Sequence, residues 1–283
     1  MNQPVITSKS NPRVKAIRAL RHRKEREATS LFFVEGIRIV TEAVELEVPI
    51  IEYVVAPELL TSRRGQETDA KLQARHIPRL EVSVEVFQTL SVKEGPRGIG
   101  AVVRQRWMQL EDVRLETGIG WVALDAPQDP GNVGTILRTC DAVGAAGVML
   151  LDQATDPYDP TALRASMGAI FSRHLVRAEF PQFLSWTREH GYPLVGTSDA
   201  AETLYDCTDY RLPLILLMGN EQHGLSPDQQ AACGLMVRIP MAGRSDSLNL
   251  AVANGVMLYE LLRRERRRGI EQPAVDERRG PVL

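Results

Sequence analysis

The chain lacks the features that mark membrane, secreted and metal-binding proteins. No apolar run approaches the roughly 18 residues of a membrane-spanning helix, and residues 1–15 lack the apolar segment of a secretory signal. The three cysteines, Cys140, Cys207 and Cys233, have the spacing of neither a disulfide framework nor a metal-ligand cluster. We therefore expect a cytoplasmic protein without a bound metal ion.

The common nucleotide-binding and hydrolase fingerprints are also missing. No G-x-G-x-x-G follows a predicted strand, and no G-x-x-x-x-G-K-[ST] phosphate loop is present. H-E-x-x-H and G-x-S-x-G are likewise absent. These absences argue against an ordinary dinucleotide or nucleoside-triphosphate site.

What the chain does have is an uneven distribution of positive charge. The formal net charge is −2, yet residues 9–26 carry eight Lys or Arg side chains against one acid, Glu25, and residues 263–268 are RRERRR. Each cluster alone is consistent with a solvated helix face. Two such clusters on a chain that is slightly acidic elsewhere favour surfaces that bind phosphate groups.

The first of two predicted α/β units covers residues 1–106. Its pattern predicts helices over 10–25, 37–46 and 70–76, a strand-to-helix segment over 82–91, and strands over 31–36, 50–59 and 97–105. Residues 107–119 are predicted to form a linker, and the polar residues 269–283 a flexible tail.

Residues 120–268 alternate regularly between apolar strands and helices. Strands are expected over 121–126, 147–152, 192–198, 212–219 and 235–241, and helices over 132–143, 160–171, 181–190, 226–233 and 247–268. Near-continuous apolar strands separated by helices predict a parallel sheet covered on both faces. The predicted fold class is therefore α/β.

Three glycine-rich stretches follow strands of this second unit, at the edge where open α/β sheets bind ligands. In "DAPQDPGNVGTILR" (125–138), Arg138 lies off the apolar stripe of the helix, and is either an ordinary exposed arginine or a residue available to a ligand. "LLMGNEQHGLSP" (216–227) carries His223, for which the sequence shows no partner. "RIPMAGRSDSLNL" (238–250) leads into the last helix, with Ser245 or Ser247 as the expected cap. That helix has more apolar surface than one core needs, which suggests a second copy of the chain as partner.

Together the three stretches resemble the SpoU (TrmH-like) branch of the SPOUT superfamily of RNA methyltransferases. The family's first motif, an asparagine with an arginine six residues later, is matched by Asn132 and Arg138. The second is matched by Gly219-Asn220-Glu221, and the third by residues 239–241 and by Ser247-Leu248-Asn249. The resemblance covers residues 120–268. The segment before it is similar to a small substrate-binding domain often fused to this family, which itself resembles RNA-binding ribosomal proteins.

The resemblance implies methylation of an RNA ribose 2′-hydroxyl with S-adenosylmethionine, a deep trefoil knot in the parallel-sheet domain, and a homodimer. The implied catalytic residues are Arg138, Asn132, Glu221, Ser247 and Asn249, and the implied cofactor-binding residues are Thr197, Gly219, Ile239, Met241 and Leu248. The residues expected to bind RNA are Lys9, Arg13, Arg18, Arg21 and Arg23. Asn132 would orient Arg138. Because arginine stays protonated, Arg138 would stabilise the developing alkoxide while phosphate or water accepts the proton.

The substrate class has alternatives. Ribosomal RNA is favoured because of the N-terminal unit, with transfer RNA second. A non-catalytic RNA-binding protein of the same fold, and an enzyme that methylates a base nitrogen, remain open at this point.

Overall fold

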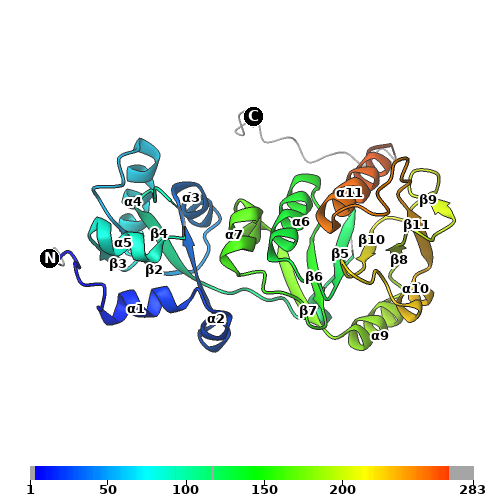
Figure 1. Ribbon diagram of the computed structural model, residues 1–283, viewed down its shortest axis with the longest axis horizontal. Coiled ribbons are helices and arrows are strands. Elements are labelled where there is room, and N and C mark those ends of the chain that lie inside the picture. Colours follow the sequence, from blue (N-terminus) through cyan, green and yellow to red (C-terminus); the bar gives the residue numbers. More distant parts are fainter. Residues whose placement is uncertain (1–3, 93, 116–117, 268–283) are drawn as a thin grey trace.

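The computed structural model describes residues 4–92, 94–115 and 118–267, so the predicted tail over 269–283 lies outside the described residues. Within these ranges the chain forms a four-stranded sheet of order β1-β4-β2-β3 and a seven-stranded sheet of order β7-β6-β5-β10-β8-β11-β9. Figure 1 shows the smaller unit at the left, the larger unit at the right, and helix α7 between them.

Helices cover both faces of the smaller sheet. Strand β4 is antiparallel to β1 and β2, and β2 is parallel to β3. One face packs against α3 and α4 and the other against α1 and α5. The strands are β1 (Leu31–Glu35), β2 (Ile50–Val55), β3 (Arg79–Glu81) and β4 (Ile99–Arg104), and the helices are α1 (Pro12–Ala19), α2 (Arg23–Thr29), α3 (Ile37–Glu45), α4 (Arg63–Ala74) and α5 (Val84–Leu90).

The single helix predicted over 10–25 is wrong, because α1 and α2 are separate helices. The chain turns between them, and the Arg26 guanidinium of α2 folds back to donate to the carbonyl oxygens of Leu20 and Arg21 at 2.9 and 2.7 Å. A helix end leaves carbonyl groups without partners, and here a side chain from the next helix satisfies them. Local periodicity contains no sign of such a contact.

All strand pairs of the larger sheet are parallel, which confirms the predicted sheet. The five predicted strands are present, and β7 and β9 were not predicted. β7 has exposed His174 and Arg177 among its five residues, and β9 has two residues, so neither is the apolar run typical of a buried parallel strand. The strands are β5 (Gly120–Asp125), β6 (Gly147–Leu151), β7 (His174–Ala178), β8 (Leu194–Thr197), β9 (Thr203–Leu204), β10 (Leu214–Met218) and β11 (Leu235–Arg238).

Helices cover both faces of this sheet, as predicted. Helices α6, α7, α8 and α11 pack on one face, and the 3-10 turn η1 with α9 and α10 on the other. The helices are α6 (Pro130–Val143), α7 (Pro160–Ser166), α8 (Ala169–Ser172), α9 (Phe180–His190), α10 (Pro227–Ala232) and α11 (Leu250–Arg267), with η1 at Leu110–Asp112. None of the helices within the described ranges is long and apolar enough to span a bilayer.

Helices α6 and α7 approach each other closely at Gly134. A Cβ atom there would overlap the backbone carbonyl oxygen of Ala162, so this glycine of the first stretch serves helix packing. The helix predicted over 160–171 is divided into α7 and α8 because Met167 and Gly168 adopt φ angles of 53° and 105°.

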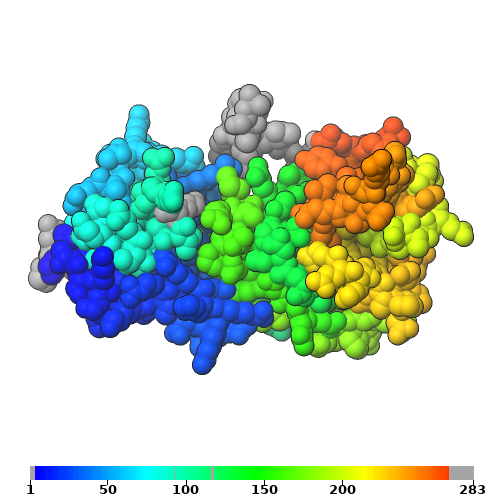
Figure 2. All heavy atoms as spheres, in the orientation of Figure 1, coloured from blue at the N-terminus to red at the C-terminus, as the bar shows by residue number. Residues whose placement is uncertain are grey.

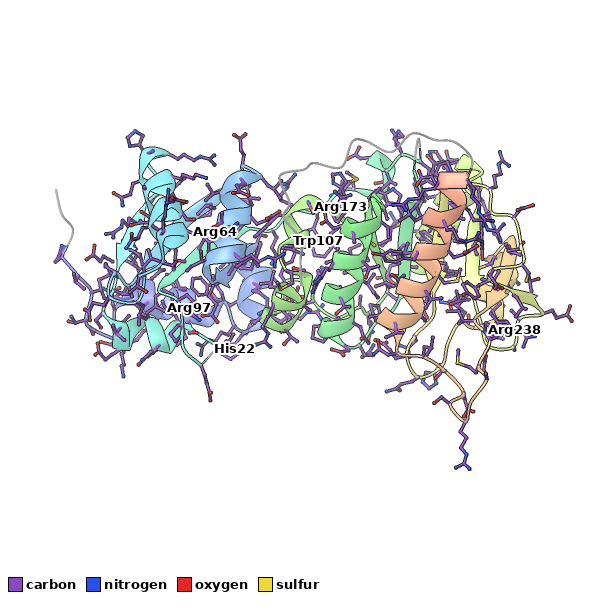
Figure 3. The ribbon with its side chains drawn as sticks, turned by 90° about the horizontal axis from the view of Figure 1, so that it is seen from above. His22, Arg64, Arg97, Trp107, Arg173 and Arg238 are labelled. Atoms are coloured by element: carbon purple, nitrogen blue, oxygen red, sulfur yellow. The ribbon has the colours of Figure 1, made fainter. Side chains whose placement is uncertain are left out.

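A buried ion pair joins the two units. Arg26 is 1% exposed, and its Nε donates to Asp156 Oδ2 at 2.8 Å, while its Nη2 lies 3.5 Å from Asp159 Oδ2. Asp159 caps α7, so Arg26 fixes the start of α7 to the smaller unit. The rings of Trp107 and Tyr158 meet edge to face with centroids 5.5 Å apart, and Figure 3 shows Trp107 in the middle of the molecule.

We expect Arg26→Ala to lower the free energy of unfolding by about 3–5 kcal/mol, because it leaves the buried Asp156 carboxylate without its partner. Urea unfolding followed by circular dichroism measures this effect. The matched control is Arg23→Ala on the same helix. Its pair with Glu27, at 2.7 Å and half exposed, should contribute no more than about 1 kcal/mol. Equal destabilisation in the two variants would contradict the role given to Arg26.

Candidate active site

The three glycine-rich stretches lie at the carboxyl edge of the larger sheet. Leu124 of β5 pairs with Met218 of β10, and Gly196 of β8 pairs with Leu217 and with Met236 of β11. Strands β5, β10, β8 and β11 therefore end side by side, and the residues that follow them share one edge. In parallel sheets this is the edge at which ligands bind.

Asn132 is the centre of a side-chain relay across this edge. Asn249 Nδ2 donates to Asn132 Oδ1 at 2.9 Å, and Asn132 Nδ2 donates to Glu221 Oε1 at 3.2 Å. Glu221 then accepts the backbone N–H groups of Gln128 at 3.1 Å and Asp129 at 3.4 Å. One buried asparagine thus connects the three stretches. We call Asn249, Asn132 and Glu221 the relay.

The direction of the relay is fixed at both ends. Asn249 Oδ1 already accepts the N–H groups of Ala251 and Val252 at 2.9 and 3.3 Å, so its NH₂ group faces Asn132. The Glu221 carboxylate can only accept. Asn132 must therefore present its oxygen to Asn249 and its NH₂ group to Glu221.

The cap of the last helix differs from the prediction. The expected caps, Ser245 and Ser247, are wrong, because α11 begins at Leu250 and the Asn249 side chain takes its first free N–H groups. Ser247 is exposed and makes no hydrogen bond within the described residues. Asn249 therefore serves both the helix and the relay.

A second asparagine braces the loop after β5. Ala126 has a φ of 38°, in the left-handed region that costs a residue with a side chain about 1–2 kcal/mol. Its carbonyl oxygen accepts from Asn220 Nδ2 at 2.9 Å and from Gln128 Nε2 at 2.8 Å. Asn220 is itself held by paired backbone hydrogen bonds with Gly224. The strained residue of the first stretch is thus Ala126, and no sequence pattern indicates it.

Arg138 lies on the exposed side of α6, as its position off the apolar stripe predicts. Thr135, one turn earlier, is exposed on the same side, whereas Asn132 is 7% exposed. Within the described residues Arg138 makes no hydrogen bond or ion pair, and the Asn132 amide is bonded to Glu221 and Asn249 instead. The guanidinium is available to an anionic ligand that reaches the site from solvent.

The residues expected to bind a cofactor follow strands β8, β10 and β11. Thr197 ends β8, Gly219 follows β10, and Ile239 follows β11. A Cβ at Gly219 would overlap the backbone of Gly224 and Leu225, so glycine lets this loop fold back on itself. Met241 is half-buried and Leu248 is 37% exposed.

The segment after β11 offers backbone groups to a ligand. Within the part of the chain that the structure describes, no backbone N–H or carbonyl group of residues 240–248 takes part in a hydrogen bond. Such groups need partners when they are covered. The donor set therefore fits a ligand held by main-chain hydrogen bonds and apolar contacts, as an adenosyl group would be.

Asp125, at the end of β5, is a titratable residue that was not predicted. Burial raises the pKa of its carboxyl group, the Asp152 carboxylate raises it further, and a hydrogen bond with Gln229 opposes both effects. His223 is exposed and makes no hydrogen bond within the described ranges. Among those residues, no cluster of three His, Cys, Asp or Glu side chains is placed to hold a metal ion.

The residues expected to bind RNA have different surroundings. Lys9 is exposed and Arg18 is half-buried. Arg13 pairs with Glu52 at 2.5 Å, and Arg23 pairs with Glu27. Arg21 Nη2 donates to the carbonyl oxygens of Thr89 and Ser91 at 2.8 and 2.7 Å. Part of the positive charge of residues 9–26 is therefore already paired within the protein.

Comparison with known proteins assigns a family to each unit. The fold and site define a parallel-sheet α/β protein whose ligand edge is tied together by a polar relay. Residues 121–259 match the SpoU rRNA Methylase family, and residues 11–101 match the MRM3-like substrate binding domain. The chain belongs to the SpoU rRNA methylase family.

Relatives and solved structures match the chain over most of its length. It is 33% identical over 251 residues to the 23S rRNA (uridine(2479)-2′-O)-methyltransferase of Streptomyces viridochromogenes, covering 86% of each chain. It is 29% identical to the 23S rRNA (guanosine(2553)-2′-O)-methyltransferase of Bacillus subtilis, covering 90% of this chain and 98% of the relative. The S-adenosylmethionine-bound structure of an rRNA methyltransferase from Sinorhizobium meliloti superposes with a TM-score of 0.84, at 39% identity, over 95% of this chain and 99% of that chain.

A double-mutant cycle tests the relay. We expect Asn132→Ala and Asn249→Ala to be coupled by about 0.5–3 kcal/mol in the free energy of unfolding, because each side chain is the other's hydrogen-bond partner. The control cycle combines Asn249→Ala with Thr135→Ala, whose hydroxyl donates to Gly131 and does not contact Asn249. Its two effects should add to within about 0.5 kcal/mol. A relay cycle as additive as the control would show that this hydrogen bond contributes nothing.

Proposed function

We propose that the chain transfers a methyl group from S-adenosylmethionine to a ribose 2′-hydroxyl of ribosomal RNA. Both curated relatives described above are named for 2′-O-methylation of 23S rRNA, and the solved structure from Sinorhizobium meliloti holds S-adenosylmethionine. Ribosomal RNA is accordingly favoured over transfer RNA. The observation in this molecule that supports the proposal most strongly is the relay, because it brings residues of all three family motifs into one connected site.

The cofactor would bind at the carboxyl ends of β8, β10 and β11. Main-chain groups of residues 240–248 would hold its polar atoms, and Ile239, Met241 and Leu248 would contact the adenosyl group. Thr197 and Gly219 would line the bottom of this cofactor site, where β8 and β10 end. When bound, S-adenosylmethionine supplies an electrophilic methyl group, so the protein itself has to position the ribose and manage the hydroxyl proton.

Arg138 would act on the ribose oxygen. Its guanidinium stays charged at neutral pH, so it would stabilise negative charge as it develops on the 2′-oxygen, and an adjacent phosphate or water would take the proton. Fixed charges aimed at developing charge are among the largest contributions to catalysis. Asn132 and Glu221 would position the loop after β5, beside Arg138. Ser247 and Asn249 would position residues 240–248, the segment proposed to hold the cofactor.

The finer features implied by the family belong to this proposal as well. We infer a deep trefoil knot in the larger unit, a likeness of the smaller unit to RNA-binding ribosomal proteins, and a cytoplasmic location alongside the RNA substrate. We also infer a homodimer through α11. Its exposed Val252 (52%) and Tyr259 (56%) lie seven residues apart on one face, away from the face packed on α6. We further infer that the substrate-binding domain covers residues 1–106, a linker residues 107–119 and the methyltransferase domain residues 120–268.

Arg138→Ala should reduce methyl transfer to RNA by at least about a hundredfold, because removing one group that stabilises developing charge typically costs that much or more. Its affinity for S-adenosylmethionine, measured by calorimetry, should not change. The control is Arg188→Ala, an exposed arginine on α9 at the opposite face of the sheet. Transfer by Arg138→Ala at the wild-type rate would refute the assignment.

The N-terminal basic segment should be tested at its exposed lysines. Lys9, Lys15 and Lys24 are exposed and make no ion pair within the described residues. Replacing all three with Gln should weaken RNA binding and reduce the slope of log affinity against log salt by about 0.7–0.9 for each phosphate that the protein no longer neutralises. An unchanged slope would remove this surface from the RNA interface.

A further inference from the structure

A cavity of about 380 Å³ lies between the two units, and none of its lining residues belongs to the relay. Its walls come from the end of α1, from β1 and the start of α3, from the residues around α5 and β4, and from α7. Apolar side chains dominate these walls, and Phe33 supplies an aromatic ring. The volume is at the lower end of the about 300–1,000 Å³ of small-ligand sites, so it suits one compact group.

The rim of this cavity is positively charged. Arg38, Arg97 and Arg164 line it, all three are exposed, and none makes a hydrogen bond or ion pair within the described ranges. Arg21 also lines it, with a buried Nε that has no partner there. The one acid among the described lining residues, Glu35, already accepts the N–H of Val92 at 2.8 Å. With four arginines against this one carboxylate, the described lining of the cavity carries a net positive charge.

An apolar hollow with a cationic rim matches the chemistry of a nucleotide. Proteins that read RNA often take an unstacked base into a pocket, against aromatic or Arg side chains. The planar guanidinium of arginine both stacks on bases and pairs with phosphate oxygens. An apolar peptide would fill the hollow but leave the arginines unpaired, and a free anion would leave the apolar walls exposed to water.

The cavity also lies between the smaller unit and the helices that carry the candidate active site. Its α7 wall includes Leu163 and Arg164, and α7 packs on α6 at Gly134. Figure 1 shows the smaller unit, α7, α6 and α11 in that order, and Figure 2 shows the green segment with α6 and α7 between the blue-cyan and the yellow-orange parts. Because Arg26 fixes the start of α7, the two sides of the cavity are held at a set distance.

We propose that this cavity binds a single unstacked nucleotide of the RNA substrate, at a position separate from the methylated one. The base would contact Phe33 and the apolar walls, and its flanking phosphates would meet Arg38, Arg97 and Arg164. The inference rests on the proposed function, which supplies the RNA. As a consequence, the enzyme would select RNAs in which the nucleotide bound in the cavity and the ribose that reaches Arg138 lie a fixed distance apart.

Val92→Trp tests the cavity without changing any charge. Val92 lines the cavity and is 45% exposed, so a larger ring there should occupy the space while the fold is kept. Affinity of the full chain for a 23S rRNA transcript should fall about five- to a hundredfold, the range expected when one base no longer stacks on the protein, with an unchanged salt slope. Affinity for S-adenosylmethionine should not change. The control is Leu46→Trp, a similarly exposed apolar residue (41%) outside the cavity.

A second variant, Arg38→Gln with Arg164→Gln, removes exposed charge and cannot disturb the core. It should lower both the RNA affinity and the salt slope, the latter by about 0.7–0.9 for each phosphate left without its arginine. If this variant has its effect but Val92→Trp binds RNA as the wild type does, the rim binds phosphate alone and the base pocket is refuted. If neither variant differs from a wild type that methylates the transcript, the cavity inference fails while the proposed function stands. If the wild type methylates no RNA, it is the proposed function that fails.

Discussion

The site depends on the two ends of one amide group. Asn132 offers its oxygen to Asn249 and its NH₂ group to Glu221. If this amide were flipped, its NH₂ group would face the NH₂ group of Asn249 and its oxygen would face the Glu221 carboxylate, and neither pair could form a hydrogen bond. Since the Asn249 oxygen is committed to the first turn of α11, folding of the last helix and assembly of the site are coupled. A buried polar group that loses its partner costs about 1–3 kcal/mol, so a displaced α11 would disturb the loops after β5 and β10 together.

The second constraint is the buried Arg26. It joins the two units by hydrogen bonds, as Asn132 joins the three loops. Its guanidinium closes the end of α1 and holds the segment that leads into α7. Helix α7 packs on α6, and α6 carries both Asn132 and Arg138. An RNA that binds the smaller unit, as proposed, would therefore be held in a defined position relative to Arg138. The cavity beside α7 lies between the smaller unit and this helix.

Sequence patterns predicted the parts of the fold that periodicity controls. The runs GVMLL and LILLM are fully buried strands, and the parallel sheet follows from them. These local patterns could not predict contacts between residues far apart in the sequence. Arg26 belongs to a basic cluster in the sequence, yet it is buried against Asp156, 130 residues away. Asn132 and Glu221 are 89 residues apart, so the family motifs identified both residues but not the hydrogen bond between them. Ser247 and Asn249 are equally good caps by residue type, and Asn249 is the one used because α11 begins at Leu250.

The central claim is that this relay supports transfer to a ribose oxygen. The most direct measurement is nucleoside mass spectrometry of a 23S rRNA transcript after incubation with the full chain and isotopically labelled S-adenosylmethionine. The account predicts the labelled methyl group on a ribose 2′-oxygen, at one position in the transcript. A label on a base nitrogen, or no label under conditions in which both RNA and cofactor bind, would contradict it.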